Sequence, residues 1–169
     1  MIHLSLKNQA RRICQIAICL VPIVFTAKTV AQEGAALSPV AIVVHKETAV
    51  DDLSMNDLRS IFLADQQFWP DRTRIILLVR APQSDERDFV LNRIYQMSEA
   101  QFRQYWIAKM FRAEVPRGPK IVFSTDMTLD LVIAIPGSIS FIRADEVTDE
   151  VKVVRVDCAL PADADYPLK

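Results

Sequence analysis

The chain has 169 residues, of which 20 are basic and 21 acidic, and its formal net charge is −1. This length corresponds to one domain with a sizeable core, and the slightly acidic balance argues against a nucleic-acid partner, which usually meets a basic face. With three cysteines and two histidines in the whole chain, we expect neither a metal site nor a cofactor.

Residues 1–31 have the layout of a secretory signal peptide. Three basic residues precede an apolar run over 13–27, and Thr29-Val30-Ala31 places small residues at the two positions that a signal peptidase reads. An uncleaved membrane anchor is the alternative, but the run is shorter than the roughly 20 apolar residues that span a bilayer. We therefore expect a cleaved signal peptide, export to the periplasm, and a flexible lead-in over 32–39.

Beyond the lead-in, the pattern alternates between strands and helices. Residues 40–45 (VAIVVH) form an apolar run of strand length, and Ser54 begins a helix, with Asp57 three positions on. Trp69-Pro70-Asp71 predicts a turn, because proline cannot continue a helix. Residues 74–80 (RIILLVR) are apolar on both faces, which predicts a strand in the middle of a sheet.

Two helices are predicted next, each beginning at a serine. Ser84 caps the first, and Ser98 with Gln101 makes a capping box for the second. The apolar residues of the second helix recur at helical spacing, so one stripe is expected to face the core. That stripe contains Phe102, Trp106 and Met110.

The remaining third of the chain adds three strands and one helix. Residues 121–123 are a short strand, and a helix capped by Ser124 or Thr125 then runs to Ile135, where Pro136-Gly137 ends it. Two further strands are expected, and the Pro- and Asp-rich tail after them is expected to be loose. These segments are residues 138–143, 151–157 and 158–169.

This alternation predicts an α/β fold with a mainly parallel five-stranded sheet and helices on both faces. The last two strands lie too close in sequence for a helical crossover, so at least one antiparallel pairing is expected there. Ligands of such sheets sit at the carboxyl ends of the strands. Arg80 and Ser84, at one such end, can hold a small oxyanion, although a surface arginine beside an ordinary helix cap has the same pattern.

Several motifs, taken in order, resemble those of one protein family. A strand ends in His45-Lys46, apolar residues follow at fixed spacing, and a tryptophan turn precedes a strand that ends in arginine. The matching residues are His45-Lys46, Leu53, Leu58, Ile61-Phe62, Trp69-Pro70-Asp71, Arg80, and Pro136-Gly137-Ser138-Ile139 with Phe141. Over residues 40–157, the chain resembles the phosphate-binding-protein-like family, the type II periplasmic solute-binding proteins of phosphate ABC transporters.

The resemblance implies a fold and a set of ligand-binding residues. Full receptors of this type close two lobes on the ligand, and this chain is short for two domains, so one lobe is expected. In the phosphate-binding members, Ser-Gly-Thr follows the arginine four residues later. Here Arg80 and Ser84 hold those places, but Asp85 and Glu86 replace Gly and Thr, and their carboxylates would repel phosphate. The candidate ligand-binding set also includes Asp85 and Arg87 in the same turn, and Lys46 and Thr125, which are expected on the same sheet edge.

Two functional hypotheses follow. The first is an exported solute-binding domain for phosphate or another small oxyanion, working with a membrane transporter in ABC-type uptake or sensing. The alternative is a protein-interaction or sensor module of the cell envelope that has lost its ligand. An enzyme is not expected, because His45 is the only histidine beyond the signal and no Gly-x-Ser-x-Gly elbow is present.

Overall fold

The computed structural model describes residues 38–169, so the predicted signal peptide and nearly all of the lead-in lie outside the described residues. Six strands form one sheet in the order β2-β6-β1-β5-β3-β4. The strands are β1 (Val40–Val44), β2 (Asp52–Leu53), β3 (Ile76–Arg80), β4 (Lys120–Val122), β5 (Ser138–Arg143) and β6 (Lys152–Val156). The helices are α1 (Met55–Phe62), α2 (Asp85–Val90), α3 (Glu99–Phe111) and α4 (Thr125–Ala134), with a π-helical turn η1 (Leu91–Tyr95) and a 3-10 turn η2 (Ala144–Glu146).

The sheet is mixed, whereas a mainly parallel sheet of five strands was expected. β3 pairs in parallel with β4 and β5, and the two-residue β2 adds a sixth strand parallel to β6. The antiparallel pairings expected near the end of the chain exist, but each is with β1, which lies between β5 and β6. Apolar periodicity identifies a strand without naming its neighbours, so the place of β1 could not be read from the sequence.

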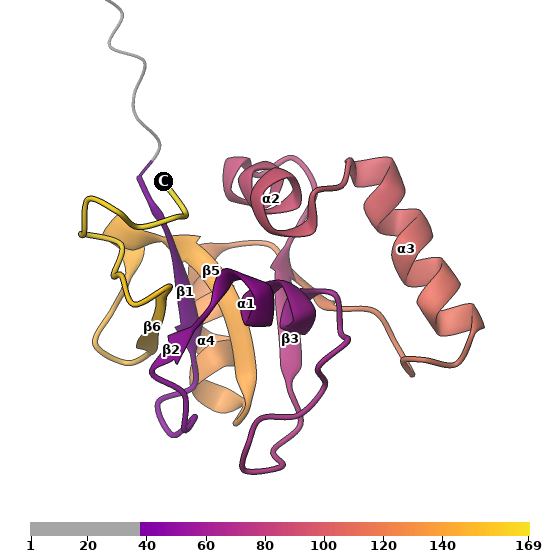
Figure 1. Ribbon diagram of the computed structural model, residues 1–169, viewed down its shortest axis with the longest axis horizontal. Coiled ribbons are helices and arrows are strands. Elements are labelled where there is room, and N and C mark those ends of the chain that lie inside the picture. The colour runs from indigo at the N-terminus through magenta and orange to yellow at the C-terminus, as the bar shows by residue number, and fades with distance from the viewer. Residues whose placement is uncertain (1–37) are drawn as a thin grey trace, which may run out of the picture. The chain divides into compact units, whose positions relative to one another are not determined.

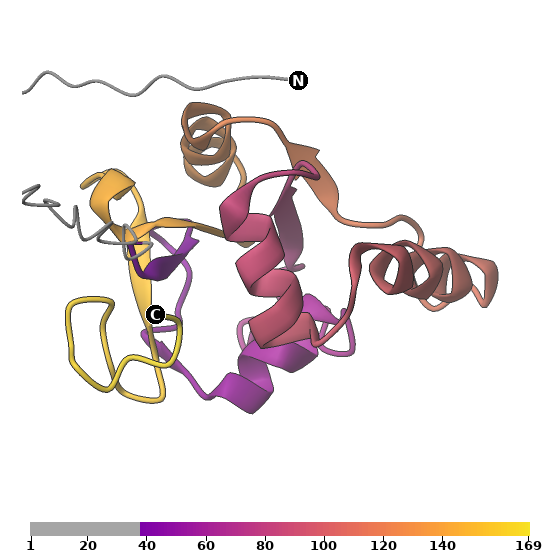
Figure 2. The ribbon, with the colours of Figure 1, turned by 90° about the horizontal axis from the view of Figure 1, so that it is seen from above.

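Helices cover both faces of the sheet, as expected. Figure 2 shows α4 on one face, and α1 and α2 on the other. Because successive side chains of a strand point to opposite faces, Ile42 packs with the larger cluster below α1 and η1, and Val43 with the smaller cluster below α4. The largest fully buried side chains include Tyr95, Phe62 and Phe141.

Helix α3 lies beside the rest of the fold (Figure 1) and is buried along only part of its length. The Ser98–Gln101 capping box at its start is present as predicted. Phe102 and Trp106 are buried, but Met110 is 41% exposed, so the predicted stripe is wrong at its last member. The far end of α3 extends beyond the core, which leaves Phe111 93% exposed.

The C-terminal segment is packed onto the sheet, although its composition suggested a loose tail. Tyr166 donates a hydrogen bond from its hydroxyl to the carbonyl of Val40 at 2.8 Å, and the amide of Val40 donates to Leu168 O at 2.9 Å. Ala159, Tyr166 and Leu168 are all buried. These apolar side chains, spaced between prolines and aspartates, anchor the segment.

Among residues 38–169, no helix has both the length and the apolar character to cross a membrane.

Candidate functional site

Three parallel strands end at the same edge of the sheet, which we call the carboxyl edge. Arg80 of β3 is paired with Val122 of β4, and Ile76 at the start of β3 is opposite Ser138 at the start of β5. The segments that follow Arg80, Val122 and Arg143 therefore meet at this edge. The amino end of β1 also reaches it, because Val40 is opposite Arg143 in the antiparallel register.

Arg80 is the central side chain of the carboxyl edge. It ends β3 and is half-buried, and the amide of the next residue, Ala81, donates to Val122 O at 2.8 Å. The guanidinium Nη1 of Arg80 is buried and has no hydrogen-bond partner among residues 38–169. A buried donor of a charged group without an acceptor is costly and uncommon in native proteins. Arg80 thus keeps an unused hydrogen-bond donor at the carboxyl edge.

Ser84 and two carboxylates begin the short helix that follows. Ser84 is the N-cap of α2, where its Oγ accepts a hydrogen bond from the amide of Arg87 at 3.3 Å. Asp85 and Glu86 line a small hollow of about 40 Å³, which Arg143 and Lys169 also line. Two carboxylates and two cations therefore share this hollow, which neither Arg80 nor Ser84 lines. The self-neutralisation expected at Arg80 stays a prediction.

Arg87 was expected at the site, but the structure turns it into the protein interior. Only 2% of this residue is exposed. Its guanidinium donates to both carboxylate oxygens of Glu99, at 2.9 and 3.1 Å, and to the carbonyl of Arg80 at 2.6 Å. It also lies 4.7 Å from the ring centroid of Phe102. Through these contacts, Arg87 links α2 to α3 and β3. Its guanidinium is therefore not available to a ligand at the carboxyl edge.

Lys46 was placed on the wrong edge of the sheet. It follows β1, which runs antiparallel to β5, with Val44 opposite Ile139. The carboxyl end of β1 therefore lies near the amino ends of β3 and β5, at the opposite end of the strands from Arg80. The expected position of Lys46 required β1 to run parallel to its neighbours. Because β1 runs antiparallel to β5, Lys46 lies at the other end of the strands from Arg80.

Thr125 does lie on the carboxyl edge, in the first turn of α4. Ser124 is the N-cap, so the choice that the sequence left open between the two residues is resolved. The hydroxyl of Thr125 donates to Glu146 Oε2 at 2.9 Å. A ligand would have to compete with this carboxylate for the hydroxyl.

Arg143, which was not expected at the site, ends β5 as Arg80 ends β3. Its Nε donates to Asp145 Oδ1 at 3.1 Å, and this hydrogen bond lowers the pKa of Asp145. The same bond, with a weaker contribution from Glu86, raises the pKa of Arg143. A strand that ends in arginine was visible in the sequence, but its adjacency to β3 was not.

In the described part of the chain, no group of three or more His, Cys, Asp or Glu is arranged to hold a metal ion.

Comparisons with models of protein families and with curated proteins find no match to this sequence. Solved structures do match. An ABC-type phosphate transport receptor from Vibrio cholerae aligns over 78% of this chain and 53% of its own, with a TM-score of 0.63 and 19% identity. A putative phosphate ABC transporter substrate-binding protein from Clostridium perfringens, with bound phosphate, aligns over 72% and 46%, with a TM-score of 0.59 and 20% identity. PstS from Borrelia burgdorferi aligns over 73% and 49%, with a TM-score of 0.59 and 15% identity.

The chain shares the fold of these receptors. The fold expected from the order of the motifs is therefore confirmed, with the change to a mixed sheet described above. The chain spans about half the length of the receptors it matches. At identities of 15–20%, the likeness concerns the fold alone, and what these receptors bind is a property of those proteins.

Proposed function

We propose that this chain is an exported binding domain that holds phosphate or a similar small oxyanion at the carboxyl edge, in ABC-type uptake or sensing in the periplasm. The observation that carries the proposal is Arg80, whose buried Nη1 has no hydrogen-bond partner among residues 38–169. An arginine fork matches the geometry of phosphate and carboxylate oxygens, and such charged hydrogen bonds are stronger than neutral ones. The role is binding and involves no catalysis.

Two hydroxyl groups from the loops of the carboxyl edge support the proposal. Ser84 uses its Oγ as an acceptor for the α2 cap, so its proton can be donated to an anion. Thr125 follows β4, the strand next to β3, and can turn its hydroxyl from Glu146 to a ligand. These groups come from two different loops of the same edge, as expected for ligand sites of open α/β sheets.

Acidic neighbours set the expected affinity. Asp85 and Glu86 lie at the same edge and line the hollow beside Arg143. Their charges oppose a bound oxyanion, and exposed ion pairs contribute little in water. We therefore expect a dissociation constant in the range of about 10 µM to 1 mM, which corresponds to roughly −7 to −4 kcal/mol.

Replacement of Arg80 tests the proposal. We expect Arg80→Ala to weaken phosphate binding by about 1.5–3 kcal/mol, because a charged hydrogen bond is lost. Isothermal titration of the full chain with phosphate measures the change. The control is Arg155→Ala, which removes an exposed arginine of β6 and should leave the affinity unchanged. Equal phosphate affinity of wild type and Arg80→Ala would contradict the proposal.

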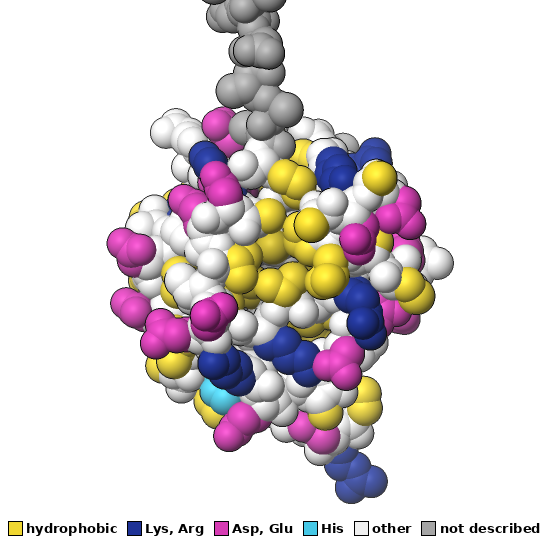
Figure 3. Space-filling model, turned by 90° about the vertical axis from the view of Figure 1, so that its left-hand side faces the viewer, with side chains coloured by type: hydrophobic (Ala, Val, Ile, Leu, Met, Phe, Trp, Pro, Cys, Tyr) yellow, Lys and Arg dark blue, Asp and Glu magenta, His cyan; other side chains and the backbone are white. Residues whose placement is uncertain are grey.

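A second candidate function is docking of an envelope protein at the same edge. The observation that favours it is Phe123, which follows β4 at the carboxyl edge and is 73% exposed. Met127, in the first turn of α4, is 36% exposed. A separate group of apolar side chains lies on the face that carries β6 and the C-terminal segment (Figure 3). Exposed apolar clusters mark interaction surfaces. In-cell cross-linking should then yield one partner band that Phe123→Ser abolishes, and a band unchanged by this replacement would refute docking here.

A further inference from the structure

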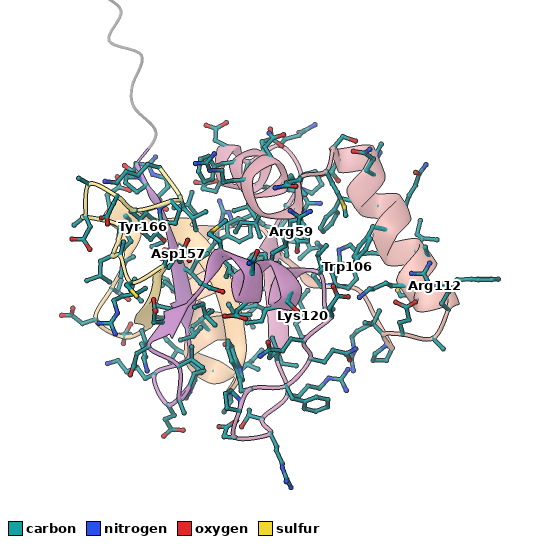
Figure 4. All side chains as sticks on the ribbon, in the orientation of Figure 1. Arg59, Trp106, Arg112, Lys120, Asp157 and Tyr166 are labelled. Carbon is teal, nitrogen blue, oxygen red and sulfur yellow. The ribbon has the colours of Figure 1, made fainter. Side chains whose placement is uncertain are left out.

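A second concave site lies away from the carboxyl edge. A cavity of about 240 Å³ is enclosed by α1, α3, the amino end of β3 and the loop over residues 115–119. Figure 4 shows Trp106 and Lys120, which both line it, in the region between α1 and α3. Lys120 begins β4 and Ile76 begins β3, so the cavity lies at the opposite end of these strands from Arg80.

The inner wall of this cavity is apolar. Four buried side chains contribute to it, one each from α1, β3 and α3, and one from the loop before β4. They are Ile61, Leu77, Trp106 and Val115. A concave site of this kind recognises the apolar part of a ligand by shape, and a few polar groups fix its orientation.

Three exposed cations, Arg74, Arg117 and Lys120, also line the cavity, while no acidic residue does. None of the three forms an ion pair within the described range 38–169. Two carboxylates that are next in sequence to lining residues are engaged with other cations. Asp65 pairs with Lys109, and Glu114 pairs with Arg112 and Lys109. The cavity therefore combines an apolar wall with uncompensated positive charge.

This combination selects a ligand class. Inorganic phosphate would leave the apolar wall unused, and an uncharged apolar molecule would leave the three cations unused. We propose that the cavity binds a small organic anion, namely a carboxylate carried on one compact aromatic or branched apolar group. The apolar group packs against Trp106, and Arg117 and Lys120 hold the carboxylate, for which guanidinium geometry is well matched.

The two tryptophans of the chain provide a built-in readout. Trp106 lines the cavity, and its Nε1–H has no hydrogen-bond acceptor among residues 38–169. Trp69 does not line the cavity, and its Nε1–H is fixed by a 2.9 Å hydrogen bond to Gly137 O. The two indole N–H resonances in a ¹H–¹⁵N spectrum thus report on the cavity and on the rest of the core separately.

The experiment titrates the ¹⁵N-labelled full chain with phenylacetate, its neutral analogue phenylacetamide, and inorganic phosphate. We expect phenylacetate to shift the Trp106 resonance in a saturable way, with a dissociation constant of about 1 mM or tighter. Phenylacetamide should bind at least tenfold more weakly, and the Trp69 resonance should stay in place. Equal binding of the acid and the amide, a Trp106 shift of the same size with phosphate, or no saturable shift with phenylacetate would each overturn the inference.

Two variants locate the ligand within the cavity. Gly118→Val adds bulk beside the indole, since a Cβ at Gly118 would lie 4.0 Å from Trp106 Cε3, an ordinary contact. It should abolish the phenylacetate response. Arg117→Gln combined with Lys120→Gln changes two exposed residues only and should weaken binding at least tenfold. The matched control, Arg155→Gln on β6, should bind as wild type does. A double variant that retains wild-type affinity would contradict the assigned carboxylate position.

Discussion

At the scale of single residues, Arg80 and Arg87 show that position decides what an arginine does. Arg80 ends a strand at the carboxyl edge and keeps a buried Nη1 without a hydrogen-bond partner among residues 38–169. Arg87 lies seven residues later, where Glu99 and a carbonyl take up its donors. Removal of one member of a buried ion pair leaves the other charge uncompensated, which costs far more than loss of an exposed pair.

The Arg87–Glu99 pair gives the first stability prediction. We expect Glu99→Gln to lower the free energy of unfolding by about 2 kcal/mol, because it leaves the buried guanidinium of Arg87 without a counter-charge, while the 29% exposure of Glu99 reduces the cost. Urea denaturation measures the loss. Arg103→Gln is the matched control, since Arg103 also contacts Glu99 but its side chain is 63% exposed, and it should cost less than about 1 kcal/mol. Equal losses for the two variants would show that burial of the pair is not what stabilises it.

Sequence patterns predicted much at the residue scale, but they missed the role of Arg87. Three of the serine caps, Ser54, Ser84 and Ser98, were placed correctly from their side chains and positions. For α4, the sequence left Ser124 and Thr125 open, and the cap is Ser124. Arg87 shares a helical stripe with Val90, Leu91 and Ile94, all of which are buried, and that spacing could have shown that it points inward. Its partner Glu99 lies twelve positions on and on another helix, so the ion pair itself was invisible in the sequence.

At the scale of elements, turns and strand pairings determine which strands are neighbours and in which direction each one runs. The apolar pattern of a single strand does not determine this. Five of the six strands were expected, because apolar runs of strand length are easily recognised. The two-residue β2 has no such pattern, and it exists because β6 lies beside it. The direction of β1 was likewise set by long-range pairing, which is why Lys46 was assigned to the wrong edge.

The Pro136-Gly137 turn before β5 supplies a prediction at this scale. Gly137 has φ +79°, and a Cβ there would lie 2.5 Å from the carbonyl oxygen of Arg74. Gly137→Ala must strain the backbone and displace that carbonyl, so we expect a loss of about 2–4 kcal/mol in the free energy of unfolding. Gly118→Ala, whose Cβ has space, should change stability by less than about 1 kcal/mol. Urea denaturation curves compare the stabilities of the two variants. Similar midpoints would contradict this account of the turn.

The C-terminal segment gives a prediction on pH dependence. Burial raises the pKa of the Tyr166 hydroxyl, which donates to Val40 O. The unfolded value is about 10, so the stability from the neutral hydroxyl is complete below that pH and declines as the pH rises through the higher folded value. Wild type should therefore lose more stability between about pH 9 and 11 than Tyr166→Phe does. Parallel stability curves for the two proteins would show that the hydroxyl is not buried as described.

At the scale of the whole molecule, the chain has the fold of phosphate receptors over about half of their length. The carboxyl edge presents Arg80 with carboxylates close by, and a separate cavity presents three cations without any lining carboxylate. The sequence predicted the fold class because its pattern extends over the whole domain. It could not reveal this distribution of charge, which depends on which loops the sheet brings together.

The acidic residues at the carboxyl edge give a prediction of increased affinity. We expect Asp85→Gly combined with Glu86→Thr to strengthen phosphate binding at least severalfold, because two charges that oppose the anion are removed. Isothermal titration compares this variant with wild type at low ionic strength. Increased salt should reduce the difference in phosphate affinity between the variant and wild type, since the charges are exposed to solvent. Unchanged or weaker binding would refute the self-neutralisation of the site.

The measurement that tests the central claim most directly is the unfolding midpoint of the full chain in phosphate and in chloride at matched ionic strength. A ligand at about 100 times its dissociation constant adds roughly 2.7 kcal/mol of stability, which raises the midpoint by several degrees. The account predicts such a rise with phosphate for wild type and its loss in Arg80→Ala. A folded wild-type chain with the same midpoint in both salts would contradict an oxyanion site at Arg80.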